Sequence, residues 1–164
     1  MKISFNLSRM YRILIYAFFL LSFDQLSKWL VVFYFQLNTK FKIDLNNQFL
    51  NFHMAWNKGI NFGLFESESV AQVYLLFLTS ILVSVALLLW VRKTKSFAIQ
   101  LSSSFVIGGA VGNAIDRLLY GAVADFINLT CCGVKNPFSF NLADIFIFIG
   151  IIGLIYFRFD EEVE

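Results

Sequence analysis

Residues 70–91 read VAQVYLLFLTSILVSVALLLWV and contain no charged side chain. About 20 apolar residues in an α-helix cross the roughly 30 Å hydrocarbon core of a bilayer, so this stretch predicts a transmembrane helix. Three other stretches of the chain are also apolar over a membrane-spanning length. They are residues 13–35, 97–119 and 140–157, and we expect each of them to form a transmembrane helix.

The composition of the whole chain supports this assignment. Of its 164 residues 59% are hydrophobic and 15% are charged, whereas an ordinary soluble domain has about 25% charged residues. A soluble globular protein is therefore excluded. The net charge of +2 is small and scattered, so no nucleic-acid partner is expected. We predict a mainly α-helical membrane protein with four transmembrane helices, forming a single integral membrane domain over residues 1–164.

The positive charges predict the orientation of these helices. Seven cationic residues fall before the first helix, between the second and third, and after the fourth: Lys2, Arg9, Arg12, Arg92, Lys93, Lys95 and Arg158. Loops rich in Lys and Arg stay on the cytoplasmic side, so both termini are expected there. This places two loops on the outer side, residues 36–69 and 121–139.

The first outer loop contains an aromatic segment, Phe49 to Leu64, with the sequence FLNFHMAWNKGINFGL. Its alternating pattern, with Gly59 and Gly63 as turn residues, predicts short strands at the membrane interface. We therefore expect a small extracytoplasmic subdomain that contains β-structure. Composition alone favours the alternative of an ordinary aromatic belt.

Polar residues inside the apolar stretches are candidates for function, because a charge near the centre of a membrane helix costs about 2.5–3.5 kcal/mol on insertion scales. Asp24 and Lys28 lie one helical turn apart and can form a buried ion pair. Asn113, Asp116 and Arg117 share one face of the third helix, where the Asp116 carboxylate can hold the Arg117 guanidinium. Either a polar bundle core or a clamp for the substrate backbone would use these three residues.

Two further carboxylates lie near the predicted outer boundary of the membrane. Asp125 follows the expected end of the third helix, at Gly121, and Asp144 lies near the start of the fourth, three residues after Asn141. If these helices are antiparallel neighbours, the two carboxyl groups can meet and share one proton, as in aspartic proteases. Spacing alone favours the alternative that the two aspartates are independent helix caps or structural residues.

Five motifs of this sequence occur in the order and approximate spacing of the signal peptidase II family, and the chain resembles that family from Asp24 to Asp144. The motifs are Asp24-Gln-Leu-Ser-Lys28, Asn57-Lys-Gly-Ile-Asn-Phe62, Gly108-Gly-Ala-Val-Gly-Asn-Ala-Ile-Asp-Arg117, Val123-Ala-Asp-Phe126 and Phe140-Asn-Leu-Ala-Asp144. One departure lies in residues 136–141, where the aromatic residue usual before the proline is missing and one extra residue follows Pro137.

The resemblance implies a membrane aspartic endopeptidase that removes the signal peptide of prolipoproteins, cutting just before a cysteine that carries diacylglycerol. It implies Asp125 and Asp144 as the catalytic pair. The residues expected to bind or orient the substrate, or to shape the site, are Asn113, Arg117, Asn141, Asn57, Gly59, Asp24, Lys28 and Asp116. No metal and no organic cofactor are implied.

The resemblance also implies a location and partners. We expect a monomer in the bacterial cytoplasmic (inner) membrane, with its active site near the outer face, in contact with prolipoprotein substrates and membrane lipids. Without the motifs, a non-catalytic four-helix protein such as a small transporter or an assembly subunit would rank first, with Asp24/Lys28 and Asp116/Arg117 as interior ion pairs. Its discriminating test is whether the protein processes a tagged prolipoprotein faster than its Asp144→Ala variant.

Overall fold

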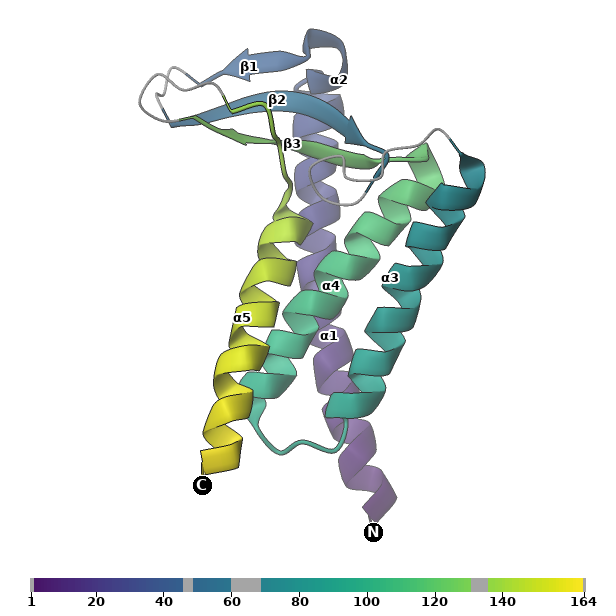
Figure 1. Cartoon of the computed structure of the whole chain (residues 1–164), viewed down its shortest axis with the longest axis vertical. Coiled ribbons are helices and arrows are strands. Elements are labelled where there is room, and N and C mark those ends of the chain that lie inside the picture. Colours follow the sequence, from purple (N-terminus) through teal and green to yellow (C-terminus); the bar gives the residue numbers. More distant parts are fainter. Residues whose placement is uncertain (1, 46–48, 60–68, 131–135, 164) are drawn as a thin grey trace.

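The computed structural model describes residues 2–45, 49–59, 69–130 and 136–163. Its long helices, α1 (Lys2–Lys28), α3 (Val70–Val91), α4 (Phe97–Tyr120) and α5 (Leu142–Val163), run side by side. A small sheet lies across one end of this bundle, and both chain termini lie at the other end, together with the turn between α3 and α4 (Figure 1).

The predicted apolar helices are confirmed, with differences at their ends. Three described helices are long and apolar enough to cross a membrane, at Leu7–Tyr34, Val70–Val91 and Phe97–Tyr120, and a shorter apolar helix covers Leu142–Phe157. Helix α1 begins well before residue 13, because hydropathy marks only the apolar part of a helix that continues into polar sequence. The π-helix η1 (Trp29–Tyr34) follows directly after α1.

Helix α5 starts two residues later than predicted because Phe140 belongs to the sheet region. Phe140 forms an isolated antiparallel bridge with Ile127, with backbone hydrogen bonds of 2.8 Å and 3.0 Å between them. Helix α4 ends at Gly121, whose φ of 72° is left-handed and whose N–H donates to Arg117 O at 3.0 Å. The predicted glycine end of this helix is therefore confirmed.

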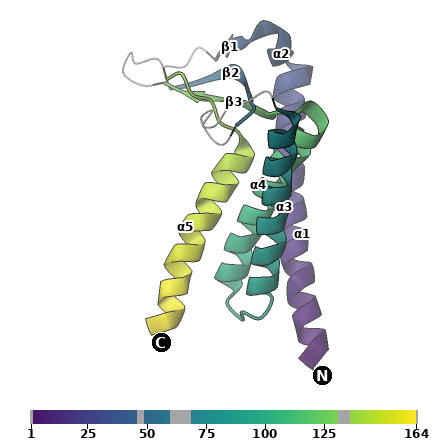
Figure 2. The ribbon, with the colours of Figure 1, turned by 45° about the vertical axis from the view of Figure 1, so that its right-hand side comes forward.

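Helix α4 is the centre of the bundle and contacts α1, α3 and α5 (Figure 2). Its small residues make this possible: a Cβ on Gly108 would lie 2.8 Å from the Ala17 carbonyl oxygen of α1, and one on Gly109 would collide with the Ala143 carbonyl oxygen of α5. Helix α3 buries only Ser84 and Val91 among its residues, so its remaining surface is available to lipid.

The sheet has three antiparallel strands in the order β1 (Lys42–Asp44), β2 (Leu50–Asn57) and β3 (Val123–Leu129). Strand β2 confirms the strand predicted within residues 49–64, of which 60–68 lie outside the described part of the chain. Strand β3 was expected only as part of an outer loop. Its first four residues are all buried, so the alternation that identifies a half-exposed strand is absent from its sequence.

A compact apolar cluster holds the sheet against η1. It consists of Val31, Val32, Leu37, Met54, Ala124 and Phe126. Leu37 lies in the short helix α2 (Leu37–Lys40) that leads from η1 to β1. This packing places strand β3 directly over the ends of α1 and α4, where the polar residues of the helices are found.

Candidate active site

Asp125 lies in β3, opposite Ala55 of β2, and only 3% of its surface is exposed. Two amide groups hold its carboxyl group. Asn57 Nδ2 donates to Oδ2 at 3.0 Å and Asn141 Nδ2 donates to Oδ1 at 2.6 Å. The Asp125 carboxyl group is therefore fixed by one residue from β2 and one from the start of α5.

The pKa of Asp125 is raised from 3.8 to about 7, first by burial and next by the nearby negative charge of Asp144. The hydrogen bonds from Asn57 and Asn141 and the positive charge of Lys28 oppose this rise. Near neutral pH, Asp125 can therefore either hold or release a proton.

Asp144 is the third residue of α5, and Asn141 is the residue that caps this helix. The two residues form a reciprocal capping pair: Asp144 N–H donates to Asn141 Oδ1 at 3.0 Å, and Asn141 N–H donates to Asp144 Oδ2 at 3.1 Å. The other carboxylate oxygen of Asp144 accepts from Asn113 Nδ2 at 2.9 Å. The carboxylate thus lies at the positive end of the helix dipole.

Asn141 contacts both aspartates, with its side-chain amide on Asp125 and its backbone and side-chain oxygen on Asp144. The structure therefore brings together the two carboxylates that the sequence placed at the ends of neighbouring helices. Asn141 is completely buried, whereas Asp144 is partly exposed.

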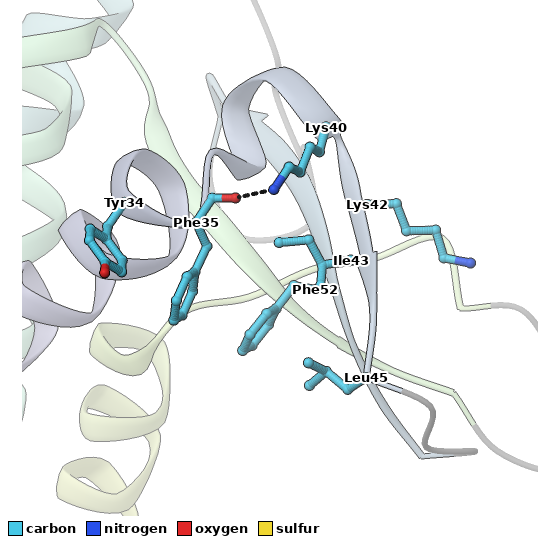
Figure 3. A pocket seen from close by; sticks show the side chains of 7 residues that line it. All are labelled: Tyr34, Phe35, Lys40, Lys42, Ile43, Leu45 and Phe52. Carbon is cyan, nitrogen blue, oxygen red and sulfur yellow. Dashed lines mark hydrogen bonds between the residues drawn. The ribbon is translucent and has the colours of Figure 1, made fainter.

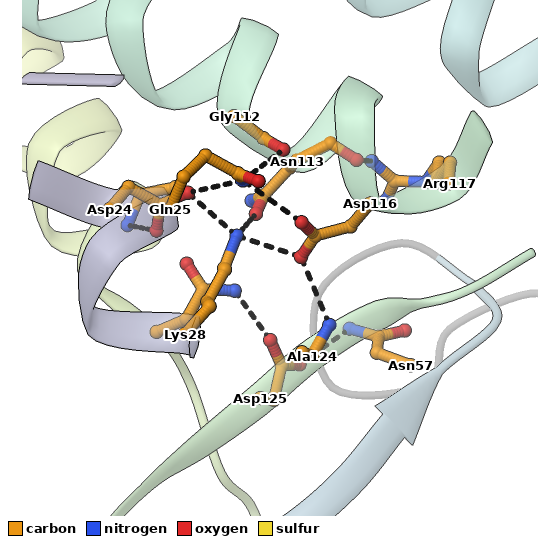
Figure 4. A network of polar contacts seen from close by, with 12 residues as sticks. Asp24, Gln25, Lys28, Asn57, Gly112, Asn113, Asp116, Arg117, Ala124 and Asp125 are labelled. Atoms are coloured by element: carbon orange, nitrogen blue, oxygen red, sulfur yellow. Dashed lines mark hydrogen bonds and ion pairs between the residues drawn. The ribbon is translucent and has the colours of Figure 1, made fainter. Parts of the chain in front are cut away.

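A second group of charges lies beside Asp125 (Figure 4). Lys28 Nζ lies 2.8 Å from Asp24 Oδ2 and 2.8 Å from Asp116 Oδ2, and it donates to Asn113 Oδ1 at 3.0 Å. The predicted ion pair between Asp24 and Lys28 is confirmed. The expectation that Asp116 holds Arg117 is wrong, because the Asp116 carboxylate turns toward Lys28 on α1 instead.

Arg117 is bound by backbone oxygens. Its Nη1 donates to Asn113 O at 3.3 Å and its Nη2 to Gly59 O at 3.1 Å, while Gly59 N–H donates to Asn57 Oδ1 at 3.0 Å. The buried Nε atom of Arg117 has no partner among the described residues. Arg117 also lines a cavity of about 170 Å³ between α3 and α4, whose other walls are Val70, Val73, Tyr74, Phe77, Leu118 and Gly121.

Sequence reasoning missed three residues of this site, Gln25, Ala124 and Ala143. Gln25 Nε2 donates to Asp24, to Gly112 O and to Asp116, at 3.2, 3.2 and 3.0 Å. The backbone N–H groups of Ala124 and Ala143 donate to Asp116 and Asp24. Gln25 could have been found as a polar residue next to Asp24 in an apolar stretch, whereas a backbone donor leaves no mark in the sequence.

Known proteins resemble this chain in sequence and in fold. Residues 16–159 match the sequence model of a family described as "Signal peptidase (SPase) II". A lipoprotein signal peptidase of Rhodopseudomonas palustris is 34% identical over 139 residues, covering 83% of this chain and 84% of that protein. A lipoprotein signal peptidase of Rickettsia africae is 42% identical over 146 residues, which cover 86% of this chain and 70% of that protein.

A lipoprotein signal peptidase of Methylobacterium radiotolerans is 41% identical over 107 residues, covering 65% of this chain; the chain spans only 62% of that protein's length. The fold is similar to a solved structure described as a bacterial membrane enzyme, determined by the in meso method at 2.3 Å resolution. The two structures superpose with a TM-score of 0.75 and share 27% sequence identity, and the match covers 92% of this chain and 89% of that one. The chain belongs to the signal peptidase II family.

Proposed function

We propose that this chain is an aspartic endopeptidase that removes signal peptides from prolipoproteins, cutting on the N-terminal side of a cysteine that carries diacylglycerol. Membership of the signal peptidase II family supports the substrate class. The observation that carries the chemistry is the arrangement of Asp125 and Asp144, two carboxyl groups in a site of low exposure that share Asn141 as a neighbour.

The proposed reaction uses one aspartate as a base and the other as an acid. The carboxylate removes a proton from a water molecule, whose oxygen bonds to the scissile carbonyl carbon, while the protonated carboxyl group donates to the carbonyl oxygen. The intermediate then collapses: its C–N bond breaks, the proton taken from water passes from the first aspartate to the leaving amine, and one hydroxyl group of the intermediate returns its proton to the second aspartate as the C=O bond forms again. The products are a free carboxyl end and a free amine, with no net change in the enzyme.

The environment of each aspartate supports an assignment of these roles. Asp125, with its pKa raised to about 7, is suited to hold the proton. Asp144 lies at the N-terminus of α5, where the helix dipole and the donors from Asn113 and Asn141 stabilise a negative charge. We therefore assign Asp125 as the acid and Asp144 as the base in the first step.

The Nε donor of Arg117, which has no partner in the described part of the chain, supports a role in substrate binding. A buried donor without a partner costs about 1–3 kcal/mol, and a carbonyl oxygen of a bound peptide would satisfy it. The cavity beside Arg117 is lined by Val73, Tyr74 and Phe77, so an apolar side chain of the same peptide can occupy it. Asn57 and Gly59 complete the wall of the site through their contacts with Asp125 and Arg117.

The placement of the elements supports the proposed orientation in the inner membrane. The site lies at the sheet end of the bundle, whereas both termini and the α3–α4 turn, which carries Arg92, Lys93 and Lys95, lie at the opposite end (Figure 1). By the positive-inside rule that end is cytoplasmic and the site faces outward. We also propose that the protein is a monomer with a single integral membrane domain.

A cavity of about 560 Å³ under the sheet supports contact with membrane lipid. Figure 3 shows Phe35 of the chain after η1 and Phe52 of β2 pointing the same way, with Ile43 and Leu45 beside them and Lys40 at the upper edge. Because the sheet follows directly after the apolar helices, we expect these side chains to lie at the height of the lipid headgroups and upper acyl chains. We propose that acyl chains of the outer leaflet cover this apolar surface.

The decisive experiment measures cleavage by the purified full-length protein in detergent or vesicles. The substrates are a precursor peptide with diacylglyceryl cysteine and the same peptide without the lipid. We expect cleavage of the lipidated substrate alone, and loss of that activity in Asp125→Asn and Asp144→Asn. Asp44→Asn, at an exposed aspartate of β1, is the matched control and should remain active. Normal turnover in either site variant would contradict the proposal and favour a non-catalytic membrane protein.

A further inference from the structure

We propose that Asp24, Asp116 and Lys28 form a positioning unit for the two catalytic aspartates. The unit fixes the position of each aspartate relative to the other, because it binds the backbone N–H of the residue before each of them. This inference rests on the proposed function of Asp125 and Asp144. It assigns to the buried ion pairs a role that goes beyond packing of the bundle.

The first half of the unit is Asp24 on α1. Its Oδ1 atom accepts a hydrogen bond at 3.0 Å from the N–H of Ala143, the residue before Asp144. Ala143 is the second residue of α5, where the backbone N–H has no partner within the helix. The carboxylate of Asp24 thus acts as an external cap that attaches the start of α5 to α1.

The second half is Asp116 on α4. Its Oδ2 atom accepts a hydrogen bond at 3.2 Å from the N–H of Ala124, the residue before Asp125. Strand β3 is thereby attached to the last turns of α4. The two halves are chemically equivalent: one buried carboxylate holds the N–H that precedes each catalytic aspartate.

Lys28 joins the two halves. Its ammonium group lies 2.8 Å from Oδ2 of Asp24 and 2.8 Å from Oδ2 of Asp116. Gln25 bridges the same two carboxylates on the other side (Figure 4). Asp24, Lys28 and Asp116 are exposed by 0%, 4% and 1%, so each charge depends on its neighbours for solvation. A displacement of one carboxylate therefore affects the other.

A third contact leads from the unit to the catalytic pair. Lys28 donates to Asn113 Oδ1 at 3.0 Å, which orients the Asn113 amide so that its Nδ2 donates to Asp144 Oδ1 at 2.9 Å. The unit therefore controls the backbone before both aspartates and one side-chain donor of Asp144. A catalytic group displaced by about 1 Å can lose about 100-fold in rate, so this control matters for turnover.

The first test is spectroscopic and does not depend on activity. In the full-length protein in detergent micelles, NMR amide signals of Ala143 and Ala124 are compared in wild type, Asp24→Asn and Asp116→Asn. We expect Asp24→Asn to move the Ala143 signal upfield most strongly, Asp116→Asn to move that of Ala124, and each variant to produce a smaller shift at the other alanine. Asp44→Asn, which breaks an exposed ion pair of the same 2.8 Å length, should move neither.

The second test measures kinetics with the lipidated precursor. We expect Asp24→Asn and Asp116→Asn to lower kcat by about 10- to 100-fold with KM changed less than twofold. We expect Lys28→Met to move the loss of activity on the alkaline side to higher pH, because the positive charge of Lys28 lowers the pKa of Asp125. Lys28→Arg, which keeps the charge, should restore the wild-type profile in part, and Lys95→Met on the exposed α3–α4 turn is the control.

The proposal would be overturned if the Ala143 signal were unchanged in Asp24→Asn, or if both carboxylate variants kept wild-type kcat and pH profile while folded. If Lys28→Met does not fold, the Lys28→Arg profile and the two carboxylate variants still decide the matter. The amide shifts separate this proposal from the function itself. Activity retained in Asp125→Asn would refute the catalytic assignment, yet leave the predicted shifts in place.

Discussion

Asn141 donates its side-chain amide to Asp125 at 2.6 Å, although the two residues belong to different elements, the start of α5 and strand β3. The same residue caps α5 and exchanges two hydrogen bonds with Asp144. Asn141 thus has two separable roles: its oxygen and backbone serve the helix end, while its amide reaches the other aspartate.

Replacement of Asn141 by serine should separate these roles. Serine is a good N-cap residue, so Asn141→Ser should keep thermal stability near that of the wild type, but its short side chain cannot reach Asp125. We expect kcat to fall by about 100-fold. Asn141→Ala, which also removes the cap, should lose a further 0.5–2 kcal/mol of stability, about the usual value of a cap. Equal activity of the serine variant and the wild type would show that the contact with Asp125 is dispensable.

The pH dependence of kcat/KM should have its alkaline limb near pH 7. Asp125 acts as the acid and must carry a proton, and its pKa is raised to about 7 by burial and by the charge of Asp144. Activity should therefore decrease as the pH rises through this value, whereas an ordinary aspartate would already be ionised above pH 4. Initial rates between pH 5 and 9, with stability checked at each pH, measure the limb. A constant rate up to pH 9 would contradict the acid role of Asp125.

Gly112→Ala should damage the site more than its small size suggests. A Cβ atom at this position would lie 2.6 Å from Asp24 Oδ2, which is the oxygen that pairs with Lys28. Gly108→Ala is the matched comparison on the same helix, because its Cβ would meet Ala17 O and Leu20 Cβ, which belong to the packing of α1 and not to the charged group. We expect both variants to lower the unfolding temperature.

At a temperature where both glycine variants are folded, only Gly112→Ala should show a large decrease of kcat, by about 10-fold or more. The measurement is single-turnover cleavage of the lipidated precursor, normalised to folded protein. Equal rates in the two variants would indicate that Asp24 can move without affecting the catalytic pair.

The apolar helices could be predicted from the sequence because length and hydrophobicity are properties of each segment alone. Residues 70–91 form α3 with the predicted bounds. Strand β3 could not be predicted, since its burial results from packing against η1 and β2, which are distant in sequence. Hydropathy also could not predict where α1 begins, because the first turns of this helix consist partly of polar residues.

The candidate site was predictable as a set of residues but only partly as a set of contacts. One helical turn between Asp24 and Lys28 was enough to predict their ion pair, because the helix determines that geometry locally. The same rule failed for Asp116 and Arg117, which are adjacent in the sequence and point to different partners: Asp116 finds Lys28 on α1 and Arg117 finds the Gly59 carbonyl. Contacts between elements depend on the packed bundle and cannot be read from spacing.

The cavity beside Arg117 leads to the last prediction. Val73 of α3 lines it, and Val83, on the same helix, is 50% exposed on the surface expected to face lipid. Val73→Trp should fill the volume of about 170 Å³ and compete with a substrate side chain, whereas Val83→Trp should not. We expect KM to rise by about 10-fold or more in Val73→Trp, because binding energy is lost equally from the ground state and the transition state. The value of kcat at saturation should stay nearly unchanged, because the catalytic residues are not altered. Steady-state kinetics on the lipidated precursor distinguishes the two variants. An unchanged KM in Val73→Trp would place the substrate elsewhere and leave the Nε donor of Arg117, unpaired among the described residues, without the proposed ligand.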